Sequence, residues 1–292
     1  MNLIKEKERE VQYLGKISKD SNYIKELSNL AFLQIETENY IKSEKNLLIC
    51  LKHFEKQQDR LGKAAVYGVL GTLYFKRGEY NKAINYYSSA YNIYHELNQI
   101  EEQINCLKGI GNSYIKLNQF DEACEKFFEC SALCSDNQDI YNMLDCLGNL
   151  IYIHETLEKW DVVYELYKKT LEAFKQLKDI KGMIISFFNL GILEKKLNQL
   201  DKAKDFFKEG TDLAIESNFA ELIIKGLTYI GEILFYQGEM KAAKERYLNA
   251  LIIAENLKAK NAILQIRILL NSFGLNEVEI DTELKKIQQD NK

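Results

Sequence analysis

Cysteine and histidine are the residue types in this sequence that most readily bind metals or take part in redox chemistry. Cys130 and Cys134 are four residues apart, which places both on one face of a helix. Cys106 and Cys146 are separated by 40 residues. These spacings are compatible with a zinc or redox site, and the elements that hold the side chains decide whether one forms.

Those elements repeat every 40 residues over most of the chain. One repeated position carries a large aliphatic residue in all six copies: Leu30, Leu70, Ile110, Leu150, Leu190 and Ile230. The next position is small in all copies but one: Ala31, Gly71, Gly111, Gly191 and Gly231, with Ile151 as the exception. Copies without an insertion indicate a repeat array that shares one continuous core, not two domains.

Each copy has the pattern of two helices joined by a tight turn. Apolar residues recur at spacings of 3, 4 and 7, the period of an amphipathic helix. The pattern is interrupted once, by Gly78, Asn118, Asn198 or Gly238, and Gly and Asn tolerate the left-handed conformation that ends a helix. We name the first helix of each copy A and the second B. Because one copy cannot bury its apolar stripe alone, the copies must stack.

The array predicts an all-α fold with capped ends. Residues 1–18 are expected to form an N-terminal capping helix, equivalent to an unpaired B helix, and residues 19–257 six 40-residue repeats. Residues 258–292 are expected to form a degenerate seventh repeat, cut short at Gly274, and a C-terminal capping helix. Proline is absent from the chain, which favours uninterrupted helices.

Composition and charge argue against several classes of function. Acidic and basic residues are mixed and give a net charge of −4, and no basic cluster marks a surface for nucleic acid or anionic lipid. The first residues are too charged for a secretory signal, and no apolar run reaches the roughly 18 residues of a membrane span. We expect a cytoplasmic protein with reduced cysteines that binds neither nucleic acid nor membranes.

The repeat resembles the tetratricopeptide repeat, W-x2-L-G-x2-Y followed by A-x3-F. The residues that carry the resemblance in one copy are Tyr67, Leu70, Gly71, Tyr74, Ala83 and Tyr87. The period of 40 residues exceeds the usual 34, as in the long repeats of kinesin light chains, Pins-type scaffolds and Rap and PlcR peptide receptors. The resemblance implies a right-handed α-α superhelix, a solenoid of about six to seven tetratricopeptide hairpins, whose concave wall of A helices holds a peptide or helix of a partner protein.

Positions on the A helices that differ between copies are free for binding, whereas constant positions serve packing. The free positions combine aromatic, amide and charged side chains, the mixture typical of a peptide groove. The predicted partner-binding residues are Lys108, Asn112, Asn149, Tyr152, Phe188, Asn189 and Tyr229. A carboxamide can pair with the N–H and C=O of an extended peptide, and the resemblance implies this role for Asn149 and Asn189.

Other interpretations of these residues stay open. The aromatic side chains can pack between neighbouring A helices, and the asparagines can cap or bridge helices. Lys108, Asn112 and Asn149 also resemble half of the carboxylate clamp of chaperone-binding tetratricopeptide proteins. Ile185 and Asn189 stand where that clamp has its further cations, which weakens this interpretation because charge-assisted bonds carry most of the affinity for a carboxylate.

The main functional prediction is a protein interaction scaffold, with two alternatives. One is a peptide-sensing regulatory receptor similar to the Rap and PlcR families, although residues 1–18 leave no room for the effector segment that such receptors usually carry. The other is a tetratricopeptide fragment of a larger protein. The identity of the partner and the oligomeric state are left open.

No group of residues supports catalysis, a cofactor or a metal. The three histidines fall on different copies and form no metal pair: His53, His95 and His154. There is no CxxC pair, and Cys50 and Cys130 occupy a position where other copies have Ala, Thr or Gly, so we interpret the cysteines as small packing residues. The glycines recur on helices, not in a phosphate-binding loop. The sequence therefore predicts a non-enzymatic protein.

Overall fold

The computed structural model describes residues 2–17 and 20–290, and within these ranges every regular element is an α-helix. This confirms the predicted all-α fold. The helices are α1 (Asn2–Ile17), α2 (Ser21–Glu36), α3 (Tyr40–Gln57), α4 (Arg60–Lys76), α5 (Tyr80–Glu96), α6 (Ile100–Lys116), α7 (Phe120–Asp136), α8 (Ile140–Thr156), α9 (Trp160–Leu177), α10 (Ile180–Lys196), α11 (Leu200–Glu216), α12 (Ala220–Tyr236), α13 (Met240–Asn256), α14 (Lys260–Asn271) and α15 (Glu277–Asp290).

A left-handed residue ends almost every helix, at intervals of 20 residues from Glu38 to Lys258. Asn118 has φ 58° and Gly238 φ 80°, as expected from the sequence. In the turn at Asn118, the N–H of Gln119 donates to the carbonyl of Tyr114 at 2.9 Å, which is the six-to-one bond of a Schellman motif. The sequence did not predict the same conformation at charged residues such as Glu158 and Lys178, because neither type favours it.

Small residues allow the two helices of a hairpin to approach closely. A Cβ added at Gly111 would lie 2.8 Å from the ring of Phe127, and one at Gly191 would lie 2.6 Å from the ring of Phe207. Both rings are fully buried. The constant positions of the repeat therefore serve packing, as the internal comparison of copies predicts.

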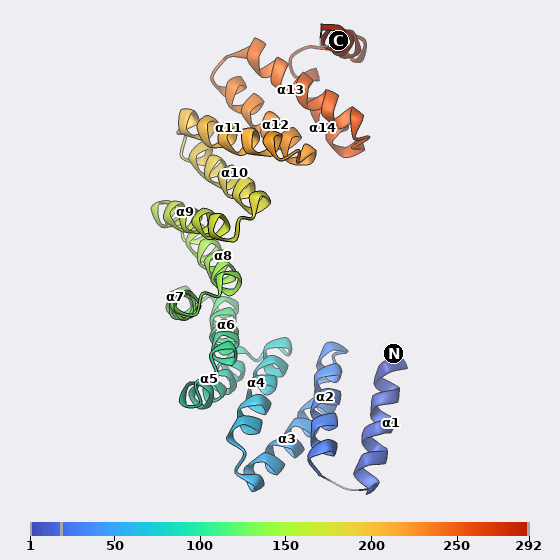
Figure 1. Ribbon diagram of the computed structural model, residues 1–292, viewed down its shortest axis with the longest axis vertical. Coiled ribbons are helices and arrows are strands. Elements are labelled where there is room, and N and C mark those ends of the chain that lie inside the picture. Colours follow the sequence, from blue (N-terminus) through green and yellow to red (C-terminus); the bar gives the residue numbers. More distant parts are fainter. Residues whose placement is uncertain (1, 18–19, 291–292) are drawn as a thin grey trace. The chain divides into compact units, whose positions relative to one another are not determined.

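The helices group into two compact units, residues 1–153 and 154–292, with the boundary inside α8. In each unit, successive helices pack as antiparallel hairpins (Figure 1). One buried cluster in the first unit includes Leu30, Leu47 and Leu70. A cluster in the second includes Tyr247 and Leu270. The predicted division at residues 18 and 257 remains an expectation.

The first and last described helices pack against their neighbours. Val11 of α1 is buried, and Lys7 forms an ion pair with Glu26 of α2. Residues 18 and 1, which the predicted capping helix includes, lie outside the described residues. At the other end, α15 buries Ile280 and Leu284.

Helix α14 ends at Asn271, three residues before Gly274, the residue at which the sequence predicts that the last repeat is cut short. Arg267 on α14 holds the final helix in place, because its guanidinium is 2.5 Å from Glu277 and 2.9 Å from Asp281 of α15. It also contacts Glu255 of α13 at 2.8 Å.

Candidate functional site

Lys108 on α6 is engaged within the first unit. Its ammonium lies 2.5 Å from the carboxylate of Asp145 and donates a hydrogen bond of 2.9 Å to the Asn142 carboxamide oxygen. Burial opposes the charged form, but the Asp145 carboxylate outweighs it, so the pKa of Lys108 is raised. A carboxylate of a partner would have to compete with Asp145 for this ammonium. Lys108 is therefore not a free lysine of the kind that a carboxylate clamp uses.

The other predicted residues of the first unit keep part of their surface. Asn112 and Asn149 are half-buried. The Asn149 amide donates to the backbone carbonyl of Asp145 at 3.0 Å, so one of its donors is occupied within the helix. Tyr152 is 54% exposed. Asn149 and Tyr152 therefore offer an amide oxygen and an aromatic surface on α8.

Phe188 on α10 is a core residue, with only 2% of its surface exposed. Its ring lies 6.3 Å from that of Phe207 and 5.6 Å from that of Tyr229. The ring occupies the space left by Gly210, where an added Cβ would be 2.7 Å away. The expectation that Phe188 faces a partner is therefore wrong. Its buried ring packs beneath the surface on which Tyr229 lies. Asn189, the next residue, is half-buried.

Tyr229 on α12 is the predicted residue that lines a cavity. Its ring stacks on Phe207 with a centroid distance of 4.7 Å, and the Lys225 ammonium lies 5.8 Å from the ring centre. The half-buried ring forms part of a cavity of about 570 Å³ between α12 and α14. Of the seven predicted residues, the structure brings Phe188 and Tyr229 into direct ring contact.

We call this region the α12–α14 groove. It comprises the 570 Å³ cavity and a second one of about 310 Å³, which share Thr228 and Leu269. The lining residues from α12 are Glu221, Ile224, Lys225, Thr228, Tyr229, Glu232, Phe235 and Tyr236, and the others are Tyr247, Ala262, Gln265, Ile266, Ile268, Leu269, Ser272 and Phe273. The groove contains all six positions of the sixth A helix that differ between copies: Lys225, Thr228, Tyr229, Glu232, Phe235 and Tyr236.

The chemistry of the α12–α14 groove is mainly apolar with a few fixed charges. Ile268 is 58% exposed and Tyr236 is 59% exposed. Phe235 packs edge-on against Phe273 at 5.3 Å, which holds the aromatic wall in place. The Glu232 carboxylate pairs with Lys195 at 2.9 Å. Such a surface can bury apolar side chains while the polar groups orient a ligand.

Sequence reasoning missed the α14 side of the groove, because it assigned no binding residues to the degenerate seventh repeat predicted within residues 258–292. The 40-residue period contains the missing signal. A shift of 40 from Lys225, Thr228 and Tyr229 gives Gln265, Ile268 and Leu269, and all three line the groove.

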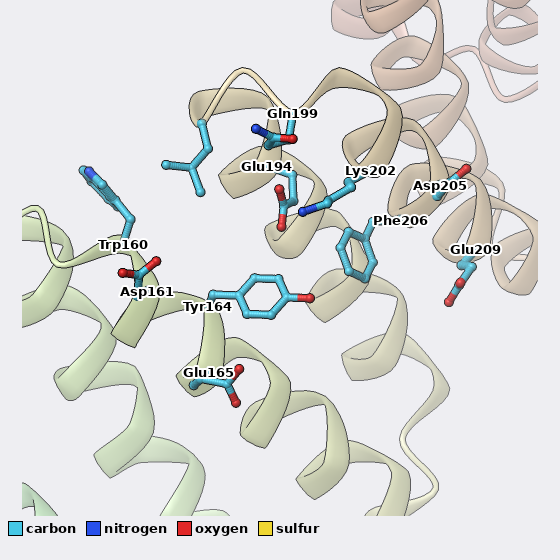
Figure 2. Close-up of a pocket in the computed structure, with 11 residues that line it drawn as sticks. Trp160, Asp161, Tyr164, Glu165, Glu194, Gln199, Lys202, Asp205, Phe206 and Glu209 are labelled. Carbon is cyan, nitrogen blue, oxygen red and sulfur yellow. The ribbon is translucent and has the colours of Figure 1, made fainter.

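A second cleft, which we call the α9–α11 groove, lies between two B helices of the same unit and has a volume of about 750 Å³. Figure 2 shows the Tyr164 and Phe206 rings pointing toward each other across it, with centroids 6.5 Å apart. The lining residues are Trp160, Asp161, Tyr164, Glu165, Glu194, Leu197, Gln199, Lys202, Asp205, Phe206 and Glu209. Five of them are acidic and one is a lysine, so the cleft is negative.

Glu194 on α10 is the buried acid of the α9–α11 groove, with 5% of its surface exposed. In Figure 2 its carboxylate points into the space between Tyr164 and Lys202. Among the described residues, the carboxylate makes no hydrogen bond or ion pair. Because Glu194 lines the groove, its carboxylate is accessible to a cation from outside.

One group of side chains has the donor set of a metal site. The sulfurs of Cys130, Cys134 and Cys146 all lie within 4.8 Å of one another, and all three residues are fully buried. The structure therefore brings Cys146 to the predicted pair on α7. Cys106 packs elsewhere, beside Ala64, Ala90 and Tyr94.

No helix in the described part of the chain has the length and apolar character needed to span a membrane. Tetratricopeptide repeat models match residues 26–96, 107–141 and 184–214. A comparison with curated proteins gives no significant match.

Several solved structures share the fold. The apo form of RapI is 17% identical, with a TM-score of 0.67 over 97% of this chain and 80% of the other. BtubC from P. vanneervenii is 19% identical, with a TM-score of 0.53 over 78% of this chain and 92% of the other. The apo quorum sensor NprR from B. thuringiensis is 14% identical, with a TM-score of 0.51 over 94% and 77%. The matched models show that the chain contains tetratricopeptide repeats, and these solved structures show that it shares their fold.

Proposed function

We propose that this protein is an interaction protein, not an enzyme, and that it binds a peptide segment or helix of a partner protein in the α12–α14 groove. The observation that carries the proposal is the coincidence of two features. The positions that vary between copies line an apolar cleft, and the same cleft is walled by exposed side chains such as Ile268 and Tyr236. Exposed apolar surface of this kind is typical of binding sites.

The contacts follow from the lining residues. An apolar anchor of the partner would pack on Ile268, Leu269 and Tyr229, and Lys225 at the rim would meet an acidic group. In the second unit, the Asn189 amide would pair with the backbone of an extended peptide. In the first unit, taken by itself, the Asn149 amide has the same pairing groups. We also retain Lys108, Asn112 and Tyr152 as contact residues, with the ion pair of Lys108 opening on binding.

A selection from a random peptide display library on the full chain tests the proposal. We expect enriched peptides with apolar anchors, and a synthetic copy of one is then measured by fluorescence anisotropy. Ile268→Glu places a charge in the groove and should weaken binding at least thirtyfold, about 2 kcal/mol. The matched control is Leu264→Glu, because Leu264 is also on α14 and 62% exposed but does not line the groove.

Equal binding by wild type, Ile268→Glu and Leu264→Glu would place the peptide elsewhere and contradict the proposal. The absence of any enriched peptide would contradict it as well. Both substituted residues are more than half exposed, so neither variant should unfold, and far-UV circular dichroism checks that they keep their helicity.

A ligand-switched receptor is the alternative form of the same proposal, and the fold that the chain shares with the quorum sensor NprR supports it. The two forms differ in the response to the peptide. A scaffold would bind without changing its radius of gyration or its oligomeric state, whereas a receptor would change one of them. Small-angle scattering with light scattering, with and without the selected peptide, separates the two. We place either activity in the cytoplasm, in keeping with the buried reduced thiols.

The unpaired Glu194 carboxylate supports a second candidate function for the α9–α11 groove. We propose that a basic segment of a partner protein docks there, with a Lys or Arg side chain reaching Glu194. The other carboxylates would attract such a segment, and the Tyr164 and Phe206 rings would contact its apolar part.

A further inference from the structure

The three buried cysteines occupy repeat positions that hold at most one cysteine in every other copy. Cys130 and Cys134 lie on the B helix α7, and Cys146 lies on the next A helix, α8 (Figure 1). Each of the other five copies has at most one cysteine in these three positions. Shifting by 40 residues gives Cys50, Phe54 and Val66; Ala90, Tyr94 and Cys106; Thr170, Phe174 and Ser186; Gly210, Ala214 and Gly226; and Ala250, Ala254 and Ile266.

Packing alone does not require three sulfurs at this junction. In the copy with Gly210 and Gly226, the ring of Phe188 fills the space. In two other copies, Phe54 and Phe174 occupy the position of Cys134. In these three copies an aromatic ring lies at the junction, whereas here three thiols converge from two helices.

The spacing of the sulfurs suits one shared ion. Three sulfurs bound to a single ion at about 2.3 Å lie about 4 Å apart in a trigonal arrangement. The sulfurs of Cys130, Cys134 and Cys146 already lie within 4.8 Å of one another. Closing the cluster onto an ion therefore requires shifts of less than about 1 Å, which side-chain rotation supplies without moving the helices.

The surroundings restrict the kind of ion. In the described part of the chain, no His, Asp or Glu atom joins the three sulfurs as a fourth ligand, and full burial excludes a coordinating water from the surface. Zinc sites are almost always four-coordinate, so zinc fits this donor set poorly. Soft thiolates select soft ions, and the cluster therefore suits a thiophilic ion that is satisfied with three ligands.

Charge narrows the choice further. Three thiolates leave a net charge of −1 with a divalent ion and −2 with Cu(I), but none with a trivalent ion. Lys108 does not neutralise the charge of a negative complex, because its ammonium is already paired with Asp145 at 2.5 Å. Since an uncompensated buried charge is costly, the neutral complex is favoured.

We propose that Cys130, Cys134 and Cys146 form a buried binding site for one trivalent thiophilic ion, with arsenite as the form in which the ion arrives. Arsenous acid, As(OH)₃, exchanges its three As–O bonds for three As–S bonds. The three thiol protons leave with the three hydroxide groups as three water molecules. Neither arsenic nor sulfur changes oxidation state, so no oxidant or reductant is needed.

The test uses the full chain, reduced and then freed of reductant, with sodium arsenite as the probe. Native mass spectrometry should show one arsenic per chain with three protons lost, and the three thiols should become protected from alkylation. The variant Cys130→Ala/Cys134→Ala/Cys146→Ser, whose residues occur at the equivalent positions of other copies, should bind at least a hundredfold more weakly.

The matched control is Cys50→Ala/Cys106→Ser. Cys50 is equivalent to Cys130, and its thiol donates to the Ile24 carbonyl at 3.6 Å as that of Cys130 does to Ile104 at 3.7 Å. Cys106 is equivalent to Cys146. The control should bind arsenite like wild type. Binding retained by the triple variant, lost equally in the control, or absent in wild type would overturn the proposal, as would tighter binding of Zn²⁺ than of arsenite.

Discussion

The α12–α14 groove and the α9–α11 groove lie in the same unit, yet they offer opposite chemistry. The first runs between A helices and is walled by Ile268, Phe235 and Tyr236, with Glu221, Lys225 and Glu232 as its charged residues. The second runs between B helices and surrounds the rings of Tyr164 and Phe206 with five carboxylates.

This difference shows how a repeat protein separates folding from recognition. The residues that hold the hairpins together, such as Ala203 and Phe207, are fully buried and recur in kind from copy to copy. The side chains that line the two grooves are not fixed by that packing, so each groove can be adapted to its own ligand. Burial of apolar area should dominate at the α12–α14 groove, and charge at the α9–α11 groove.

Neutralising the α9–α11 groove should produce the largest effect. With Asp161→Asn, Glu165→Gln, Asp205→Asn and Glu209→Gln combined, a fluorescent basic peptide selected on this protein should bind about a hundredfold more weakly, roughly 0.7 kcal/mol per exposed charge. Anisotropy measures the loss. The α12–α14 peptide should bind the same variant as it binds wild type, and a parallel loss would show that the two grooves are not independent.

Glu194→Gln isolates the buried acid within the same comparison. It should weaken binding of the basic peptide about tenfold, because it removes the groove acid whose side chain is almost fully buried. The same substitution should leave the stability of the free protein nearly unchanged, since the carboxylate has no ion pair among the described residues that the change would remove. Lower stability of Glu194→Gln in urea would mean that the carboxylate has a structural partner and would contradict the docking proposal.

Alkaline pH should lower the stability of the fold through Tyr247, which lines the α12–α14 groove. Burial, aided by Glu232 and Tyr236, raises the pKa of Tyr247 to about 12 from its ordinary value near 10. Because the folded pKa is the higher one, the neutral ring stabilises the fold fully below pH 10. This contribution, on the order of 2 kcal/mol, is lost as the pH rises from 10 to 12.

Tyr247→Phe is the check on that assignment. The variant cannot ionise at this position, so its free energy of unfolding in urea should fall less steeply between pH 10 and 12 than that of wild type. A control, Tyr141→Phe, alters a highly exposed ring and should follow wild type. If Tyr247→Phe also follows wild type, other buried tyrosines dominate the alkaline transition.

The sequence predicts the packing better than the grooves, for a physical reason. The aliphatic and small positions recur every 40 residues because every hairpin meets the same neighbour geometry, so the period alone identifies Leu70 or Gly191 as packing residues. A groove depends on which side chains remain uncovered after stacking. Phe188 was expected in the groove because its position varies between copies, but Gly210 on the neighbouring helix leaves space that the ring fills. Glu194 lies on no variable face, and its burial follows from the α9–α11 neighbours that only the fold brings together.

Added salt should produce the smallest effect on the α12–α14 groove. Its two charged groups closest to the apolar wall are Lys225, which lies over the Tyr229 ring, and Glu232, which is paired with Lys195. Of these two groups only Lys225 lacks an ion pair among the described residues, so a ligand meets little uncompensated charge at this wall. Since exposed charges are screened within about 10 Å at 0.1 M salt, raising NaCl from 50 to 500 mM should weaken the α12–α14 peptide less than about threefold. The basic peptide at the α9–α11 groove should lose far more over the same range. Only a surface with uncompensated charge loses affinity when salt screens it. An equal dependence of the two affinities on salt concentration would therefore mean that both grooves bind their peptides in the same way.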